Sequence, residues 1–250
     1  MQRRFRNRVS FLLCIAALVA AMSFKSVGND KFGTVNIEFR HYVGDSILVL
    51  DDKSYSNSLG QTFNVSNIKY YICNIHLKRR DGTEYVSKEY FLVNEAETVS
   101  KSVLLNNVPA GDYTSLTFTL GVDSMHNCSG AQSGALDPVN AMFWAWNTGY
   151  IFLKLEGKSA ASASPGKIFE FHVGGYKQPY NHIRSITLDM PGQGLQVSTS
   201  AVATMVLKAD IAKVFNSDTV IDISKTSSIT EPKSAKVVAD NYVHMFSLLK

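Results

Sequence analysis

Catalytic and local metal-binding motifs are missing from this sequence of 250 residues. None of its three cysteines or six histidines follows a CxxC, HxH or HxxxH spacing, so no zinc site can be identified from local motifs. A GxSxG motif, a phosphate-binding glycine loop and a Ser/His/Asp arrangement are also absent. We therefore expect a protein that is not an enzyme and that has no catalytic residues.

A long run of lysine or arginine is also missing, and the basic charge is concentrated at the start of the chain. Residues 1–8 carry four arginines and no acid, and the apolar run 9–22 follows. This run is short for a membrane span, so residues 1–23 are predicted to be a secretory signal peptide, cleaved after Ser23 or after Ala21. Its removal takes the formal charge from +4 to zero. We expect a periplasmic or extracellular protein that binds no nucleic acid and has no membrane span in its mature chain.

The rest of the chain, residues 33–250, has the pattern of one β-rich domain. In residues 35–43, apolar and polar side chains alternate, as they do in a half-buried strand. Long crossover helices between strands are missing, so an all-β, antiparallel β-sandwich is predicted, with short helices at 209–215 and 235–249. Further strands are expected at residues 47–50, 68–78, 89–93, 102–105, 113–122, 150–155, 168–173, 183–190 and 195–208.

Two cysteines remain after the predicted cleavage. Cys14 is removed with the signal peptide, and the bulky Leu13 before it does not fit a lipoprotein signal. Cys73 lies on the apolar face of a strand, where a buried small hydrophobe is the simpler interpretation, and Cys128 lies in a polar loop. Outside the cytoplasm such a pair could form a disulfide, but the sequence does not give the distance between them.

Two histidines are placed by strand patterns. His41 shares the apolar face of its strand, where it is either a hydrogen-bonded core residue or a metal ligand. His172 lies on the polar face of its strand, just before a glycine pair that lets backbone or ligand approach closely. His126 and His182 lie in loops, as secondary metal candidates or as solvated residues.

Three sequence blocks have an unusual composition. They read GVDSMHNCSG at 121–130, LDPVNAMFWAWNTGYIFLKLEG at 136–157, and FHVGGY at 171–176. Together they closely resemble the MbnP-like family of extracytoplasmic copper-binding proteins, the methanobactin-associated periplasmic protein family. The resemblance extends from about Thr34 to near the C-terminus and is densest over residues 121–175.

The resemblance implies a copper site. It assigns His41, in the segment FRHYVG, and His172 as ligands, and a pair of imidazoles favours the cuprous ion. Some family members carry a tryptophan oxidised to kynurenine, whose amino group joins the histidines at copper, and a di-haem partner enzyme performs the oxidation. Trp144 or Trp146 would be the modified residue, although large aromatics more often anchor a core. Met142 is either a soft ligand or a core residue.

Two alternatives remain open. Oxygen-bearing side chains around the same blocks could hold calcium, although their spacing does not match an EF-hand and such residues also cap turns. These residues are Asp123, Asn127, Ser129, Asp137 and Asn140. The alternative function is a metal-free β-sandwich that binds a protein or a glycan at the cell surface through the tryptophan loop.

Overall fold

The first long strand shows why this chain forms a sandwich. In the computed structural model, which describes residues 31–144 and 149–249, β1 runs from Phe32 to Val43. Its apolar side chains at Val35, Ile37 and Phe39 are buried, as is His41, and the residues between them are more exposed. The predicted alternation is therefore confirmed. The expected signal peptide and Trp146 lie outside the described residues.

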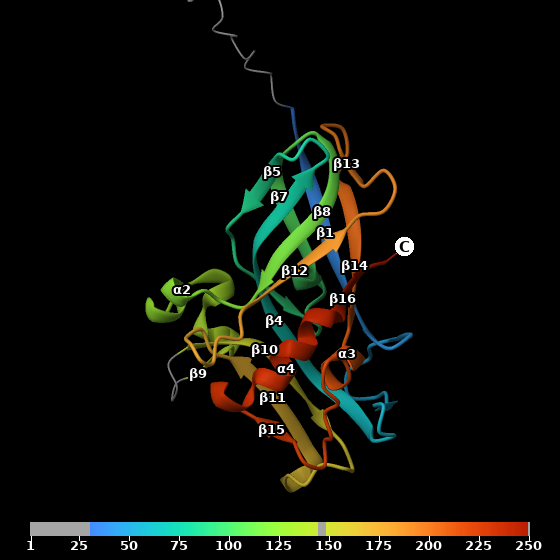
Figure 1. Cartoon of the computed structure of the whole chain (residues 1–250), viewed down its shortest axis with the longest axis vertical. Helices are drawn as coiled ribbons and strands as arrows, with labels where there is room; N and C mark the ends of the chain where they lie inside the picture. The colour runs from blue at the N-terminus through green and yellow to red at the C-terminus, as the bar shows by residue number, and fades with distance from the viewer. Residues whose placement is uncertain (1–30, 145–148, 250) are drawn as a thin grey trace, which may run out of the picture. The chain divides into compact units, whose positions relative to one another are not determined.

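Two sheets face each other. In the first sheet β1 pairs with β14 in parallel and with β2 and β7 in antiparallel fashion, and β14 also pairs with β16 (Figure 1). These strands are β2 (Ser46–Ile47), β7 (Ser102–Pro109), β14 (Ala203–Asp210) and β16 (Phe246–Leu248). The remaining strands belong to the second sheet and its extensions, where, among the described strands, only β11 and β15 pair in parallel.

The second sheet is built around one long strand, β4 (Thr62–Arg79), which pairs with both β8 and β10. Its order is β12, β8, β4, β10, β11, β15, and shorter strands extend it. The strands are β3 (Tyr55–Ser56), β5 (Glu84–Ser87), β6 (Phe91–Asn94), β8 (Gly111–Leu120), β9 (Phe143–Trp144), β10 (Gly149–Lys158), β11 (Ile168–Gly174), β12 (Arg184–Asp189), β13 (Leu195–Val197) and β15 (Ser228–Ile229).

Aromatic side chains join the two sheets. The Phe39 ring of the first sheet lies 6.1 Å from that of Tyr70 and 6.3 Å from that of Phe118, both in the second sheet. Phe246, in β16, lies 5.1 Å from Phe118. Such edge-to-face pairs contribute roughly 0.5–1.5 kcal/mol each beyond the burial of their area. The all-β, sandwich-like fold predicted from the sequence is confirmed, and Lys31–Lys250 form one compact unit.

The helices are short and differ from expectation at several places. The predicted helix at 235–249 ends early, because residues 246–248 pair with β14 as β16. The helix expected at 209–215 begins only at Ala212, and the strand expected at 195–208 is divided into β13 and β14. The helices are α2 (Ser124–Cys128), α3 (Ala212–Phe215), α4 (Lys236–Tyr242) and the 3-10 turns η1 (Thr98–Lys101), η2 (Gly134–Leu136), η3 (Pro138–Asn140), η4 (Pro165–Lys167), η5 (Pro232–Ser234) and η6 (Val243–Met245).

The short helices lie around the sheets. Helices α3 and α4 contact each other, and α2 projects beside the strands at the other side of the view (Figure 1). Helix α2 was not predicted, because its segment was expected to be a polar loop. Within residues 31–144 and 149–249, no helix is long and apolar enough to cross a membrane.

Candidate metal site

His41 sits in a closed hydrogen-bond network between the sheets. Its Nδ1 lies 2.7 Å from Oε2 of Glu95, and its Nε2 lies 3.0 Å from the hydroxyl of Tyr70. Lys101 donates to the same Glu95 oxygen over 3.0 Å. Burial alone would raise the pKa of Glu95, but the hydrogen bonds from His41 and Lys101 lower it below its ordinary value. Both ring nitrogens of His41 are therefore engaged, as in a satisfied core histidine.

His172 has a different environment, because among the described residues only one of its ring nitrogens has a hydrogen-bond partner. Its Nε2 lies 2.7 Å from Oε1 of Glu156, and the other oxygen of Glu156 accepts a hydrogen bond of 2.8 Å from Asn67. The hydrogen bond from His172 holds the pKa of Glu156 at about 2. A carboxylate that accepts Nε2–H leaves Nδ1 with a free lone pair, which is how metal-binding histidines are commonly oriented.

The structure does not bring His41 and His172 together. Leu153 of β10 lies opposite Tyr70 on one side and Val173 on the other, so these three side chains share the buried face of the sheet. The next positions, Lys69, Lys154 and His172, share the opposite face because side chains alternate along each strand. His41 contacts Tyr70 on the buried face, so the sheet separates the two histidines. They do not form one two-histidine site in this arrangement.

Trp144 lies on the same face of the sheet as His172. A methyl carbon added at Gly174 would stand 2.5 Å from Cζ3 of Trp144, so the indole covers this glycine. Gly174 follows His172 by two residues on β11, and side chains two apart on a strand point the same way, with Cα atoms roughly 6–7 Å apart. Because Gly174 has no side chain, it leaves the space that the Trp144 ring occupies. Trp144 is nearly buried, with 5% of its surface exposed.

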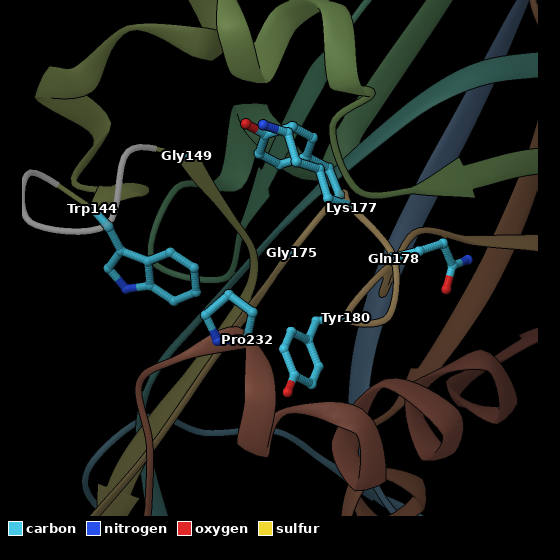
Figure 2. A pocket seen from close by; sticks show the side chains of 8 residues that line it. Trp144, Gly149, Gly175, Lys177, Gln178, Tyr180 and Pro232 are labelled. Atoms are coloured by element: carbon cyan, nitrogen blue, oxygen red, sulfur yellow. The ribbon is translucent and has the colours of Figure 1, made fainter.

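A surface pocket of about 280 Å³ opens beside Trp144. Figure 2 shows the Trp144 indole, Pro232 and the Tyr180 ring around the same hollow, with Gln178 farther to one side. Gly149, Gly175, Tyr176 and Lys177 complete its lining. The Lys177 ammonium lies 5.0 Å from the centre of the Tyr176 ring. The pocket therefore has aromatic walls and one cation.

His182 lies just behind this pocket and is buried. Its Cδ2 is 3.1 Å from where a Cβ at Gly175 would stand, and its Nε2 lies 2.7 Å from the carbonyl oxygen of Pro232. Its Nδ1 is buried and has no hydrogen-bond partner among the described residues. Burial lowers the pKa of His182, so its imidazole is neutral at neutral pH. Of the two alternatives for His182, a metal ligand or a solvated residue, its burial excludes the second.

The two cysteines are free and lie in different surroundings. Cys73 is buried in β4 and donates to the carbonyl oxygen of Gly121 over 3.6 Å, and Cys128 is exposed at the end of α2 and contacts the hydroxyl of Tyr176 over 3.4 Å. The disulfide considered for them is therefore not formed. Burial raises the pKa of Cys73 to about 12, so this thiol is protonated at neutral pH in the metal-free protein.

The other candidate ligands for copper or calcium are buried in the core or form hydrogen bonds with nearby backbone groups. Met142 is completely buried within the core, as a gap-filling residue would be. Among the residues considered for calcium, both aspartates accept backbone N–H groups at the start of short helices, and the asparagines and Ser129 donate to backbone carbonyl oxygens. Within the part of the chain that the structure describes, no group of three or more His, Cys, Asp or Glu side chains could hold a metal ion.

The sequence did not identify Glu156, Asn67, Tyr70 or Glu95 as partners of the histidines. Strand alternation puts Glu156 and His172 on the polar faces of β10 and β11. This shared polar face is the one feature of the sequence that could have indicated that the two side chains are partners. The pairing register of the two strands, in which Glu156 lies opposite Glu170 and diagonal to His172, comes from the folded sheet alone.

Comparison with known proteins supports the family assignment. No curated protein matches the chain. Among solved structures, MbnP from Methylosinus trichosporium is similar, with a TM-score of 0.55 and 15% sequence identity over 80% of this chain and 81% of that chain. At this identity the similarity shows a common fold. The family model described as MbnP matches residues 32–234. Because this match spans most of the sequence, the chain belongs to the MbnP family.

Proposed function

We propose that this chain is an exported, noncatalytic protein that binds copper through His172 and stores, scavenges or passes on the ion. The observation that carries the proposal is the Glu156–His172 pair, in which the carboxylate holds one ring nitrogen and the other has no hydrogen-bond partner within residues 31–144 and 149–249. Imidazole is a good ligand for copper, and a site with few ligands favours the cuprous ion. His41 is less suited, because both of its ring nitrogens already have partners.

The tryptophan loop supplies the second part of the proposal. Family resemblance implies that a tryptophan oxidised to kynurenine can contribute its amino group to copper. The Trp144 ring covers Gly174, which lies two positions after His172 on β11, and this supports a role for Trp144. A di-haem oxidase in the host would be the modifying partner. Modification would appear in peptide mapping of native protein as the loss of one carbon and the gain of one oxygen at that residue.

Export is the third part of the proposal. The four arginines and the apolar run of residues 1–23 support secretion to the periplasm or beyond. The amino terminus of protein isolated from its host tests this directly. We expect cleavage before Phe32, and an intact Met1 terminus would contradict export by a cleaved signal peptide.

Cuprous titration tests the metal site. Anaerobic competition with a chromophoric cuprous chelator should show about one equivalent of copper bound to the mature wild-type chain. We expect His172→Ala to lower the affinity at least a hundredfold while leaving the far-ultraviolet spectrum unchanged, because a ligand contributes to the loaded state alone.

His76→Ala is the matched control. His76 also pairs with a glutamate, since its Nδ1 lies 3.1 Å from Glu84, but it is far more exposed than His172. This variant should bind copper as the wild type does. Equal affinity in the wild type and in His172→Ala would refute binding through His172, and a wild-type protein that takes up no cuprous ion would refute cuprous binding by this chain.

A further inference from the structure

Three donor atoms meet beside helix α2, away from the Glu156–His172 pair. They are the hydroxyl of Tyr90, Oδ2 of Asp123 and Nδ1 of His126. The imidazole nitrogen lies 3.1 Å from the Tyr90 hydroxyl and 2.9 Å from Asp123 Oδ2, and the Tyr90 hydroxyl donates a hydrogen bond to that same oxygen. Each of the three atoms therefore contacts both of the others.

Two sides of this triangle, from His126 Nδ1 to the Tyr90 hydroxyl and to Asp123 Oδ2, have about the length expected between two ligands of one metal ion. The Tyr90–Asp123 side is shorter and must lengthen when the phenol proton between these oxygens leaves. With metal–ligand bonds of about 2.0–2.1 Å, two ligands at right angles stand roughly 2.8–3.0 Å apart. The other oxygen of Asp123 is occupied, because it accepts the backbone N–H of His126 over 2.9 Å, and this contact fixes the carboxylate. The Tyr90 and His126 rings also pack together with centroids 4.6 Å apart, which fixes their donor atoms.

We propose that Tyr90, Asp123 and His126 form a second metal site, which binds a cupric ion through one nitrogen and two oxygen atoms. The site shares no residue with the Glu156–His172 pair, so it does not depend on cuprous binding there. Two oxygens and an imidazole suit a borderline divalent cation, and among these the cupric ion binds most strongly. About a third of the His126 side chain and two fifths of the Asp123 side chain are exposed, so solvent can supply the remaining ligands.

The number of protons released when the cupric ion binds depends on which of the three side chains carry a proton in the metal-free protein. Burial and the hydrogen bond to Asp123 raise the pKa of the Tyr90 phenol, so it is protonated in the metal-free protein. Burial alone would raise the pKa of Asp123, but hydrogen bonds from Tyr90 and His126 lower it, so this group is already a carboxylate. Binding therefore expels the phenol proton to solvent, and the proton that His126 donates from Nδ1 to Asp123 moves to Nε2, which leaves the Nδ1 lone pair for the metal.

A direct test is titration of the mature chain with cupric ion supplied as its glycine complex. A phenolate bound to cupric ion gives a visible charge-transfer band, which neither histidine nor carboxylate produces. We expect this band in the wild type, an electron paramagnetic resonance signal coupled to nitrogen, and an affinity that rises about tenfold per pH unit because one proton is released.

Variants then separate this site from the cuprous site. Tyr90→Phe keeps the ring but should abolish the band and lower cupric affinity at least tenfold, and His126→Gln should remove the nitrogen coupling. His172→Ala and the exposed-histidine control His76→Gln should retain both signals. Absence of the band from the wild type, or an unchanged band and affinity in Tyr90→Phe, would overturn the proposal.

Discussion

Nε2 of His172 and Oε1 of Glu156 lie 2.7 Å apart on the face of the sheet that points away from the core. Glu156 is itself held by Asn67 of the neighbouring strand β4. Three adjacent strands thus fix the orientation of one imidazole. This arrangement distinguishes His172 from His41, whose network occupies both ring nitrogens.

Replacing Glu156 should weaken copper binding without removing a ligand. In Glu156→Gln the side chain keeps its shape but loses the charge that orients His172, and losses of this kind typically cost about 10–100-fold in metal affinity. Cuprous competition titration measures the effect. Glu170→Gln is the matched control, because Glu170 lies directly opposite Glu156 in the strand register and bonds to Ser228 instead. Equal affinities in the two variants would contradict the role given to Glu156.

Replacing His41 should affect folding rather than metal binding. His41→Ala leaves the Tyr70 hydroxyl and the Glu95 carboxylate without their partner in a buried setting, which should lower the free energy of unfolding by about 2–4 kcal/mol. Urea denaturation of the metal-free protein measures this loss, and cuprous titration of the folded variant should give the wild-type affinity. A large loss of copper affinity with unchanged stability would make His41 a ligand.

The Glu156–His172 pair also predicts an acid dependence of stability. The pKa of Glu156 is about 2 in the folded protein, below its ordinary value in an unfolded chain. A depressed carboxyl pKa stabilises the fold above the unfolded value, and this contribution is lost as the pH falls from about 4.5 to about 2. Because the group is partly exposed, we expect the contribution to be about 1–2 kcal/mol. Thermal unfolding across this range should show a shallower decline in Glu156→Gln than in the wild type.

Gly174 should be needed for the position of Trp144. In Gly174→Ala the new methyl carbon would stand 2.5 Å from both Cζ3 of Trp144 and the carbonyl oxygen of Tyr150. The indole or the backbone must move, and overpacking of this kind costs roughly 1–3 kcal/mol. We expect a lower melting temperature and a shifted tryptophan fluorescence spectrum. A variant with wild-type stability and emission would show that Trp144 does not cover Gly174.

Strand periodicity was the most reliable guide to the fold. The alternation at Val35–Val43 correctly identified β1, its buried face and the burial of His41. The C-terminal segment was less predictable, because the helical spacing of Val238, Tyr242, Met245 and Leu249 continues past the end of the helix, whereas Phe246–Leu248 pair with β14. Helix α2 was missed because its five residues carry no apolar periodicity, and Asp123 capping His126 is its main local signal.

The sequence by itself determined which side chains point toward the core and which point away, since this depends on alternation along a single strand. The sequence therefore placed His41 on the buried, apolar face of its strand and His172 on the polar face of its strand. The tertiary structure decided what each histidine contacts, because strand pairing brings Glu156 to His172 and Glu95 to His41 from distant parts of the chain. The same applies to Tyr90, which lies 33 and 36 residues before Asp123 and His126 and meets them only when β6 and α2 are in place.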